Sequence, residues 1–468
     1  RRTRALSSAV CALGLIGAAA VEAGQAPRQS MPPAPALRQS APPVPAPRPA
    51  LPAPVTDADY GPVDLAAARL GRLLFNDPIL SGNRNISCAG CHHPRFATAD
   101  GASLGLGEGS IGLGPDRRPD PANPPEARIP RNAPALFNLG AREFRVMFHD
   151  GRVEAHASSP HGIRTPLGAD MVAGLDGVLA AQAMFPVTSA DEMAGHAGEN
   201  DVATAVRKGR LSGPDGVWAL LAARVAAIPE YADMAAGVWP AIGKTRDLTF
   251  VDLANAMAAF MALEWRSDDS PFDAHLRGQA PLTGAAADGM ALFYGDAGCA
   301  ACHSGPFQTD HGFHAMGVPQ IGPGKKLAFE RHSRDVGRQA VTGRDEDAYR
   351  FRTPSLRNVL RTGPWGHDGA YADMAAFLRA HCGDEDAYDR SQAVLPVLDG
   401  ASDWDALDDP AELAAIRAAS HRDGGPRPLT AAEIDALIAF LGALSDPVAL
   451  SGRMGAPDAV PSGLPPGG

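Results

Sequence analysis

The string Cys-x-x-Cys-His occurs twice in this chain, and it constrains the fold more than any other feature. The two copies are Cys88-Ala-Gly-Cys91-His92 and Cys299-Ala-Ala-Cys302-His303. This spacing is the attachment signature of c-type haem, in which both thiols bond to one haem and the adjacent histidine reaches the iron. A zinc site does not need a histidine directly after both pairs, and a thiol oxidoreductase needs a thioredoxin-like βαβ context that the sequence lacks. The strings therefore predict two covalently bound c-type haems, with His92 and His303 as proximal iron ligands.

The segment before each string is also repeated. Gly71-Arg-Leu-Leu-Phe75 precedes the first string, and Gly289-Met-Ala-Leu-Phe293 precedes the second. Further apolar residues recur at helical spacing, and Thr430-Ala-Ala-Glu433 has the form of a capping box that opens a helix. Strand patterns are hard to find, and glycine and proline together make up 94 of 468 residues (51 plus 43), which favours long loops. We expect a mainly α fold with little strand, built from two cytochrome c-like domains that each carry one haem.

The ends of the chain differ in composition from the part between them. Residues 1–23 have a basic start, an apolar stretch and small residues at a cleavage position, which is the layout of a secretory signal peptide. An uncleaved anchor is the alternative, although the apolar stretch is shorter than the ~20 residues of a membrane span. Residues 24–58 are proline-rich and predict a disordered linker. We expect the two haem domains at 59–246 and 247–447, and a disordered tail at 448–468.

The charge of the chain limits its partners. Forty-two basic and 53 acidic residues give a net charge of −11, which argues against a nucleic-acid-binding protein. No later segment resembles a membrane span, so the mature protein is expected to be exported to the periplasm without one. A homodimer is one oligomeric state that the sequence leaves open.

Several strings resemble the bacterial di-haem cytochrome c peroxidases, the family that includes the methylamine dehydrogenase maturase MauG. Their order matches the family from about residue 60 to 445. The strings are Leu74–Ser81, Ser87–His92, Arg131–Asn138, Asp150–Arg152, Gln182–Pro186, Glu192–Met193, Ser270–Asp273, Cys299–His303, Arg352–Asn358 and Thr362–Gly369.

The resemblance implies that peroxide reacts at the first haem and that the second haem receives electrons. Gln182 and Glu192 match the family's distal Gln and Glu, which lie ten residues apart. A carboxylate at that position can move a proton between the two oxygens of H2O2, and an amide can hydrogen-bond the bound oxygen. The alternative is that both are ordinary solvent-exposed residues of helices.

The resemblance also implies a sixth ligand for the second iron and a calcium ion. In peroxidases of the family this ligand is a Met, and in MauG a Tyr, fourteen residues after the His of the His-Asp-Gly string. Here that count from His367 ends at His381, with Met374 and Tyr371 as the alternatives. Asn132, Thr362 and Pro364 match the calcium ligands of the family, although they could also be plain loop residues.

The sequence departs from the family pattern at two positions and in one insertion. In the resting form of many family members a loop histidine binds the iron of the first haem and blocks it. No histidine of this sequence matches that residue, so we expect the iron to keep an open coordination position in every oxidation state. His149 occupies the place of the tryptophan between the haems, and an insertion follows at about 153–179.

These features lead to one expected function and two alternatives. The expected function is a periplasmic peroxidase that reduces hydrogen peroxide to water with electrons from a small cytochrome c or cupredoxin. A MauG-like enzyme that oxidises residues of a partner protein is the first alternative. A non-catalytic dihaem electron-transfer cytochrome is the second, and Gln182 and Glu192 count against it.

Overall fold

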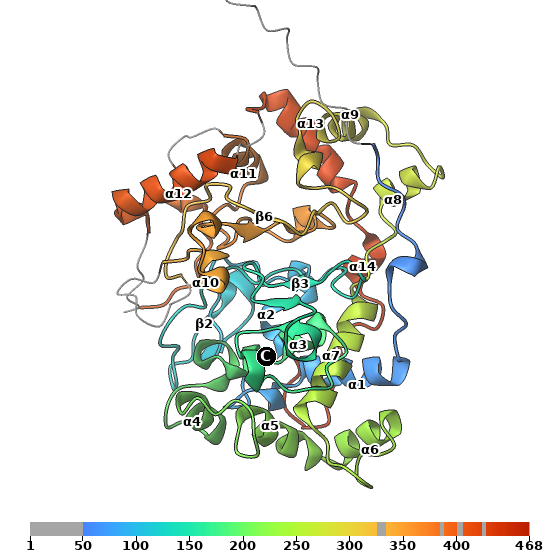
Figure 1. Cartoon of the computed structure of the whole chain (residues 1–468), viewed down its shortest axis with the longest axis vertical. Coiled ribbons are helices and arrows are strands. Elements are labelled where there is room, and N and C mark those ends of the chain that lie inside the picture. The colour runs from blue at the N-terminus through green and yellow to red at the C-terminus, as the bar shows by residue number, and fades with distance from the viewer. Residues whose placement is uncertain (1–49, 325–333, 384–387, 400–405, 424–426, 468) are drawn as a thin grey trace, which may run out of the picture. The chain divides into compact units, whose positions relative to one another are not determined.

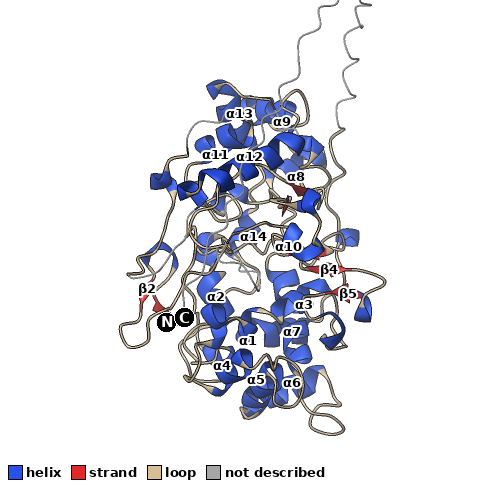
Figure 2. Ribbon diagram, turned by 60° about the vertical axis from the view of Figure 1, so that its left-hand side comes forward, coloured by secondary structure: helices blue, strands red, loops and turns tan. Residues whose placement is uncertain are grey.

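Helices and long loops make up most of the protein, as a computed structural model shows (Figures 1 and 2). The structure describes residues 50–467 apart from 325–333, 384–387, 400–405 and 424–426. The predicted signal peptide and most of the predicted linker lie outside the described residues. The α-helices are α1 (Leu65–Asn76), α2 (Cys88–Cys91), α3 (Val178–Ala183), α4 (Asp201–Arg207), α5 (Val217–Ala226), α6 (Pro229–Val238), α7 (Phe250–Glu264), α8 (Pro271–Leu276), α9 (Gly284–Phe293), α10 (Gln339–Thr342), α11 (Met374–His381), α12 (Pro410–Asp423), α13 (Ala431–Gly442) and α14 (Pro447–Ser451).

The strands are short, as the sequence predicts. β1 (Ser110–Ile111) pairs with β2 (Arg118–Pro119), and β6 (Phe313–His314) pairs with β7 (Phe351–Arg352), both antiparallel. β3 (Val146–Met147), β4 (Val153–Ala155) and β5 (Ile163–Arg164) form an antiparallel sheet. The mainly α architecture with little strand is thus confirmed for the described part of the chain.

Two helix pairs organise the two hydrophobic cores. In the first, α1 packs against α7 so closely that a side chain at Gly71 would overlap the backbone carbonyl of Ala256. In the second, α9 packs against α13, and a side chain at Gly289 would overlap the carbonyl of Ala436 in the same way. Both glycines belong to the repeated strings, so the repeat exists because each copy needs a close helix crossing before its Cys-x-x-Cys-His string.

Two asparagines mark the equivalent ends of α7 and α13. Asn138 donates its backbone N–H to Trp265 O at 3.0 Å, and Asn358 donates to Leu444 O at 3.1 Å. Both have a positive φ, 61° and 62°, a conformation that Asn tolerates better than most residues. The structural similarity of the two halves of the chain therefore extends beyond the repeated strings that are visible in the sequence.

This equivalence bears on the boundary between the two halves. We expected the second domain to begin at residue 247, which places α7 in it. The structure packs α7 on α1, and the side chains of α7 belong to the first core together with Trp265, whereas Phe272 belongs to the second core. α7 thus lies with the first core although it follows the expected boundary. The partner of α1 lies far along the chain, and α7 carries no local sign of which core it joins.

The predicted disordered tail is also corrected. Leu450, Met454 and Leu464 pack against the first core, and α14 opens this segment. The buried carboxylate of Glu264 accepts the backbone N–H groups of Met454 and Gly455 at 2.5 and 2.9 Å. A Pro/Gly-rich segment can be ordered when apolar side chains and a buried acceptor hold it, and its composition does not reveal those partners.

The end of the predicted linker is ordered as well. Val55 is buried in the first core, and Asp57–Asp59 form a short 3₁₀ turn. Arg266 pairs with Asp57 at 2.5 Å, so residues 50–58 lie against the folded part of the chain. Among the described residues, no helix combines the length and the apolar character that a membrane crossing requires.

Candidate haem and peroxide sites

The first Cys-x-x-Cys-His string forms α2 and the residue after it. His92 donates Nδ1–H to the carbonyl of Thr98 at 2.8 Å, which orients the ring and leaves Nε2 free for a metal. Burial lowers the pKa of His92, so the imidazole is neutral, as a metal ligand must be. The local geometry therefore fits an iron ligand at Nε2.

The second string is built in the same way. His303 donates Nδ1–H to the carbonyl of Gln308 at 3.1 Å. Thr98 and Gln308, the two acceptors, both have a positive φ, 64° and 49°. Burial also lowers the pKa of His303. The repeat thus extends to the hydrogen bond that fixes the tautomer of each proximal histidine.

A cavity of about 580 Å³ surrounds the second string. Cys299, Cys302 and His303 line it, together with apolar side chains. Ligand cavities of a few hundred Å³ with mostly apolar walls are typical of cofactor sites. The volume, the thiols and the imidazole are together the donor set and the space that a c-type haem needs.

His381, the last residue of α11, lies across this cavity from His303. The ring centroids are 6.3 Å apart. Two imidazoles on opposite sides of one metal, each with a bond of about 2 Å, have ring centres about 6 Å apart. Nδ1 of His381 is buried without a hydrogen-bond partner, and burial lowers the pKa of this histidine to about 4.

The two alternative ligands are placed differently. Met374, at the first residue of α11, lines the same cavity two helical turns before His381. Tyr371 is buried in a separate small apolar cluster and does not line the cavity. The ring spacing favours His381 over both.

Glu192 lies in a π-helical turn, Ala190–Ala194, that Ser189 caps through a 3.4 Å hydrogen bond to the Glu192 N–H. Such turns occur frequently at functional sites. Burial dominates the pKa of both His92, which it lowers, and Cys91, which it raises; the Glu192 carboxylate adds a smaller effect on each, so it lies within electrostatic reach of the first string. The fold therefore brings together residues that are a hundred positions apart in the sequence.

Gln182 lies near the end of α3, one 3₁₀ turn before the segment that carries Glu192. Its Oε1 atom is buried and has no hydrogen-bond partner. A buried amide oxygen without a partner is costly, and a bound water or ligand would remove that cost.

A polar network that the sequence analysis missed holds the Glu192 turn. Glu108 donates its N–H to Asp191 O at 3.0 Å, and its buried carboxylate accepts from Asn83 Nδ2 at 2.6 Å. Asn200 donates to Asn83 Oδ1 at 2.8 Å and to Ala194 O at 3.0 Å. These residues come from separate loops, and no sequence pattern joins them.

Arg117 is a second residue that the sequence did not single out. Its buried guanidinium donates to Gly90 O at 2.5 Å and to Cys91 Sγ at 3.3 Å. It therefore supports the helix that presents the two thiols of the first string. Arg117 lies in the Gly/Pro-rich loop between residues 101 and 134, where spacing carries no signal.

His149 is half-buried and lines the cavity of the second string. Its Nε2 donates to the carbonyl of Asn132 at 3.1 Å. Burial, with the Arg131 guanidinium next, lowers the pKa of His149 to about 3, so the ring is neutral. His149 thus occupies the cavity wall rather than a position at the first string.

The residues matched to calcium ligands gather on one wall of the same cavity. Asn132, Thr362 and Pro364 all line it. A side chain at Gly369 would meet Asn132 Nδ2 at 2.8 Å and Pro364 Cγ at 3.1 Å, so these two residues converge there. Asn132 Nδ2 already donates to Ala102 O at 2.7 Å, so the side-chain oxygen is the atom of this residue that could bind a cation.

A duplicated helical unit with a Cys-x-x-Cys-His string in each copy defines the class of two-haem, cytochrome-like proteins. Comparison with known proteins agrees: residues 65–281 match the family model of the di-haem cytochrome c peroxidases. This match agrees with the resemblance to the di-haem cytochrome c peroxidases and MauG that the motifs indicated, and relatives of both names are similar to the chain. The family implies two haems.

Relatives of both kinds resemble the chain. It is 29% identical over 331 residues to the methylamine utilization protein MauG of Methylorubrum extorquens, covering 70% of this chain and 71% of that protein. It is 28% identical over 320 residues to the cytochrome c551 peroxidase of Pseudomonas aeruginosa, covering 68% and 72%.

Solved structures share the fold. A MauG-like protein associated with microbial copper homeostasis superposes with a TM-score of 0.52 at 25% identity, covering 87% of this chain and 96% of that one. The diheme peroxidase BthA of Burkholderia thailandensis superposes with a TM-score of 0.53 at 22% identity, covering 86% and 91%.

Proposed function

We propose that the protein is a periplasmic peroxidase that reduces hydrogen peroxide to water. One haem is attached to Cys88 and Cys91 with His92 as its proximal ligand, and the other to Cys299 and Cys302 with His303. The overall reaction consumes one H2O2, two electrons and two protons and yields two waters. A small cytochrome c or a cupredoxin supplies the electrons through the second haem.

The observation that carries this proposal is the buried Oε1 of Gln182, which has no hydrogen-bond partner and lies in the segment just before the π-helical turn of Glu192. A haem bound there would supply an iron with an open position that binds peroxide and passes electrons to it. The Glu192 carboxylate takes a proton from one peroxide oxygen and delivers it to the other, so that water leaves. The unpartnered Oε1 of Gln182 accepts a hydrogen bond from the bound peroxide.

The second site is proposed to carry electrons and not to bind peroxide. His303 and His381 hold the iron from both sides, and their spacing supports this assignment. Bis-imidazole ligation leaves no position for a substrate. A calcium ion held by the Asn132 side chain and the carbonyls of Thr362 and Pro364 is proposed at the wall of this cavity, because oxygen ligands suit that cation.

A MauG-like function is the second candidate, because MauG is among the relatives that resemble the chain over 70% of its length. In that case the oxidising equivalents of peroxide would pass to residues of a partner protein. A plain electron carrier would use neither Gln182 nor Glu192.

The test is steady-state peroxide turnover with a reduced small cytochrome c. A peroxidase oxidises two equivalents of the cytochrome for each peroxide consumed. A MauG-like enzyme shows little turnover with the cytochrome but consumes peroxide when its protein substrate is present. A chain that exchanges electrons with the cytochrome and leaves peroxide unconsumed is a carrier, and that result would overturn the proposal.

A further inference from the structure

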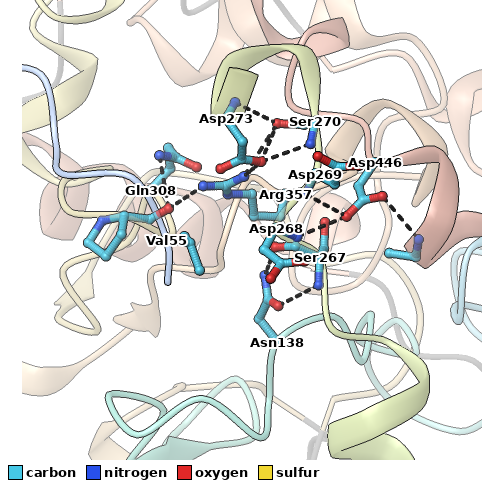
Figure 3. A network of polar contacts seen from close by, with 12 residues as sticks. Val55, Asn138, Ser267, Asp268, Asp269, Ser270, Asp273, Gln308, Arg357 and Asp446 are labelled. Atoms are coloured by element: carbon cyan, nitrogen blue, oxygen red, sulfur yellow. Dashed lines mark hydrogen bonds and ion pairs between the residues drawn. The ribbon is translucent and has the colours of Figure 1, made fainter. Parts of the chain in front are cut away.

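A buried ion pair lies behind the proximal histidine of the second site. Arg357 and Asp273 both have fully buried side chains, and Nη1 lies 2.5 Å from Oδ2 (Figure 3). Ser270 donates its N–H and its hydroxyl to the same oxygen of Asp273, at 2.9 and 2.6 Å. A buried pair of this kind costs desolvation free energy and is weak evidence for stability alone. Stability alone therefore does not explain why the pair is buried at this place.

Arg357 also supports the loop that orients His303. Its Nη2 donates to Pro306 O at 2.5 Å, and the side-chain amide of Gln308 donates to Gly305 O at 3.2 Å. The carbonyl of Gln308 is the acceptor for His303 Nδ1. The guanidinium is thus separated from the proximal hydrogen bond by one short loop.

The position equivalent to Arg357 in the first half of the chain carries no charge. Asn138 and Asn358 are equivalent, because each follows a Pro-x-Leu-x string and donates to the end of its core helix, α7 or α13. The residue before each asparagine is Phe137 in the first half and Arg357 in the second. Phe137 is buried in the apolar core. At this equivalent position the two copies therefore differ by a buried guanidinium, which the second copy has and the first does not. The first site has its own buried guanidinium, Arg117, at a different place, beside Cys91.

The two residues of the ion pair differ in their position relative to the cavity. Arg357 lines the cavity around the second string, whereas Asp273 does not. In a low-dielectric interior the nearer charge dominates the field of a pair. An oxidised iron carries one more positive charge than a reduced iron, so a nearer cation favours the reduced state.

We propose that the Arg357–Asp273 pair sets the reduction potential of the second haem, with Arg357 raising it and Asp273 moderating that effect. This inference rests on the proposed attachment of a haem to Cys299 and Cys302. Bis-imidazole ligation lowers an iron potential relative to a thioether ligand. A buried cation beside the cavity offsets part of that decrease without a change of ligand.

The test is a spectroscopic redox titration of the purified two-haem protein and its variants. Arg357→Gln should make the second haem harder to reduce, by at least tenfold in the equilibrium constant, or about 59 mV for a one-electron couple. Asp273→Asn should shift it in the opposite direction. Glu154→Gln is a matched control, because it breaks another buried pair, Glu154 with Arg338 at 2.8 Å, away from the cavity lining.

Opposite shifts in the two variants, with the control and the first haem unchanged, would support the proposal. A structural role alone would move both variants in the same direction, and that result, or no shift in either, would overturn it. If Arg357→Gln does not fold, Asp273→Asn alone decides the sign, and Arg357→Lys, which keeps the charge, should stay within tenfold of the original protein. Covalent haem content separates this test from the proposed function: one haem or none in the unchanged protein would refute the attachment instead.

Discussion

The imidazole rings of His303 and His381 face the same cavity with their centres 6.3 Å apart, although 78 positions (381 minus 303) separate them in the sequence. His303 belongs to a string that predicts its role, whereas His381 was found only by counting from another motif. Nδ1 of His381 is buried without a hydrogen-bond partner, which costs free energy. A function of the ring would explain why this cost is tolerated. Iron ligation is the function that the spacing favours.

Replacing His381 should therefore change the second haem specifically. His381→Ala should convert its low-spin absorption spectrum to a high-spin one, because one axial ligand is lost. His381→Met should keep the low-spin form and raise the potential, since a thioether favours the reduced metal. Met374→Ala is the matched control from the same helix, and a loss of the low-spin spectrum in that variant alone would assign the ligand to Met374.

Replacing Glu192 should reduce peroxide turnover while leaving both haem spectra close to those of the unchanged protein. General acid–base groups contribute about 10² to 10⁴ in rate, so Glu192→Gln should lower kcat by that factor. Gln182→Ala should cost less, because an amide positions the substrate and transfers no proton. Turnover measured with reduced cytochrome c checks both, and an unchanged kcat for Glu192→Gln would remove this residue from the mechanism.

The fully oxidised protein should react with peroxide without prior reduction. Between His93 and the Asp150–Arg152 string, a stretch that the structure describes in full, the one histidine is His149, and it lines the cavity of the second string. Stopped-flow mixing of oxidised protein with peroxide should show an immediate change at the first haem. A first haem that stays low-spin and inert until one electron is added would contradict this expectation.

His149 should limit the sharing of oxidising equivalents between the two sites, because an imidazole is harder to oxidise than an indole. His149→Trp should therefore speed that sharing in the same stopped-flow experiment. His149→Phe, which fills the position without a readily oxidised ring, is the control and should not speed it. Equal rates in all three proteins would show that the position carries no oxidising equivalents.

Acid should weaken the contact between the two halves. Arg131 pairs with Asp335 at 2.7 Å and with Asp150 at 2.7 Å, and all three are buried. Burial alone would raise the pKa of Asp335, but the Arg131 guanidinium overrides it and lowers this pKa to about 2. An unfolded Asp has a pKa of about 3.9, so the stability from this carboxylate is present above about pH 4 and is lost as the pH falls toward 2.

Thermal unfolding measured from pH 7 to pH 2 checks this dependence. Asp335→Asn should flatten the acid limb of the stability profile and lower stability at neutral pH. Arg131→Met should be more severe, about 3 to 5 kcal/mol, because it leaves two carboxylates buried without their cation. An acid limb that Asp335→Asn leaves unchanged would assign the acid sensitivity to other groups.

Removal of residues 453–468 should destabilise the first half. The deletion exposes apolar surface under Met454 and Leu464, and it strips the buried Glu264 carboxylate of backbone donors. Loss of partners for a buried charged group costs more than about 1 to 3 kcal/mol. The unfolding midpoint should fall, and Glu264→Gln should reproduce part of the effect. A midpoint that does not change would show that the segment only lies on the surface.

The sequence alone determined the features that depend on local spacing. Two thiols and an adjacent histidine must occupy fixed positions to bind one haem, so Cys88–His92 and Cys299–His303 were readable without a structure. The capping box at Thr430 and Glu433 was equally local, and the structure confirms it as the start of α13. The close helix crossings at Gly71 and Gly289 left a repeated string for the same reason.

Tertiary structure alone decided which distant segments meet. That α7 joins α1, that the last residues pack on Glu264, and that Arg357 stands where the first half has Phe137 depend on contacts between parts of the chain far apart in sequence. Local propensity and spacing do not encode such contacts, because the free energy that selects them comes from burying two surfaces together. Each surface by itself looks like an ordinary helix face or a Pro/Gly-rich loop.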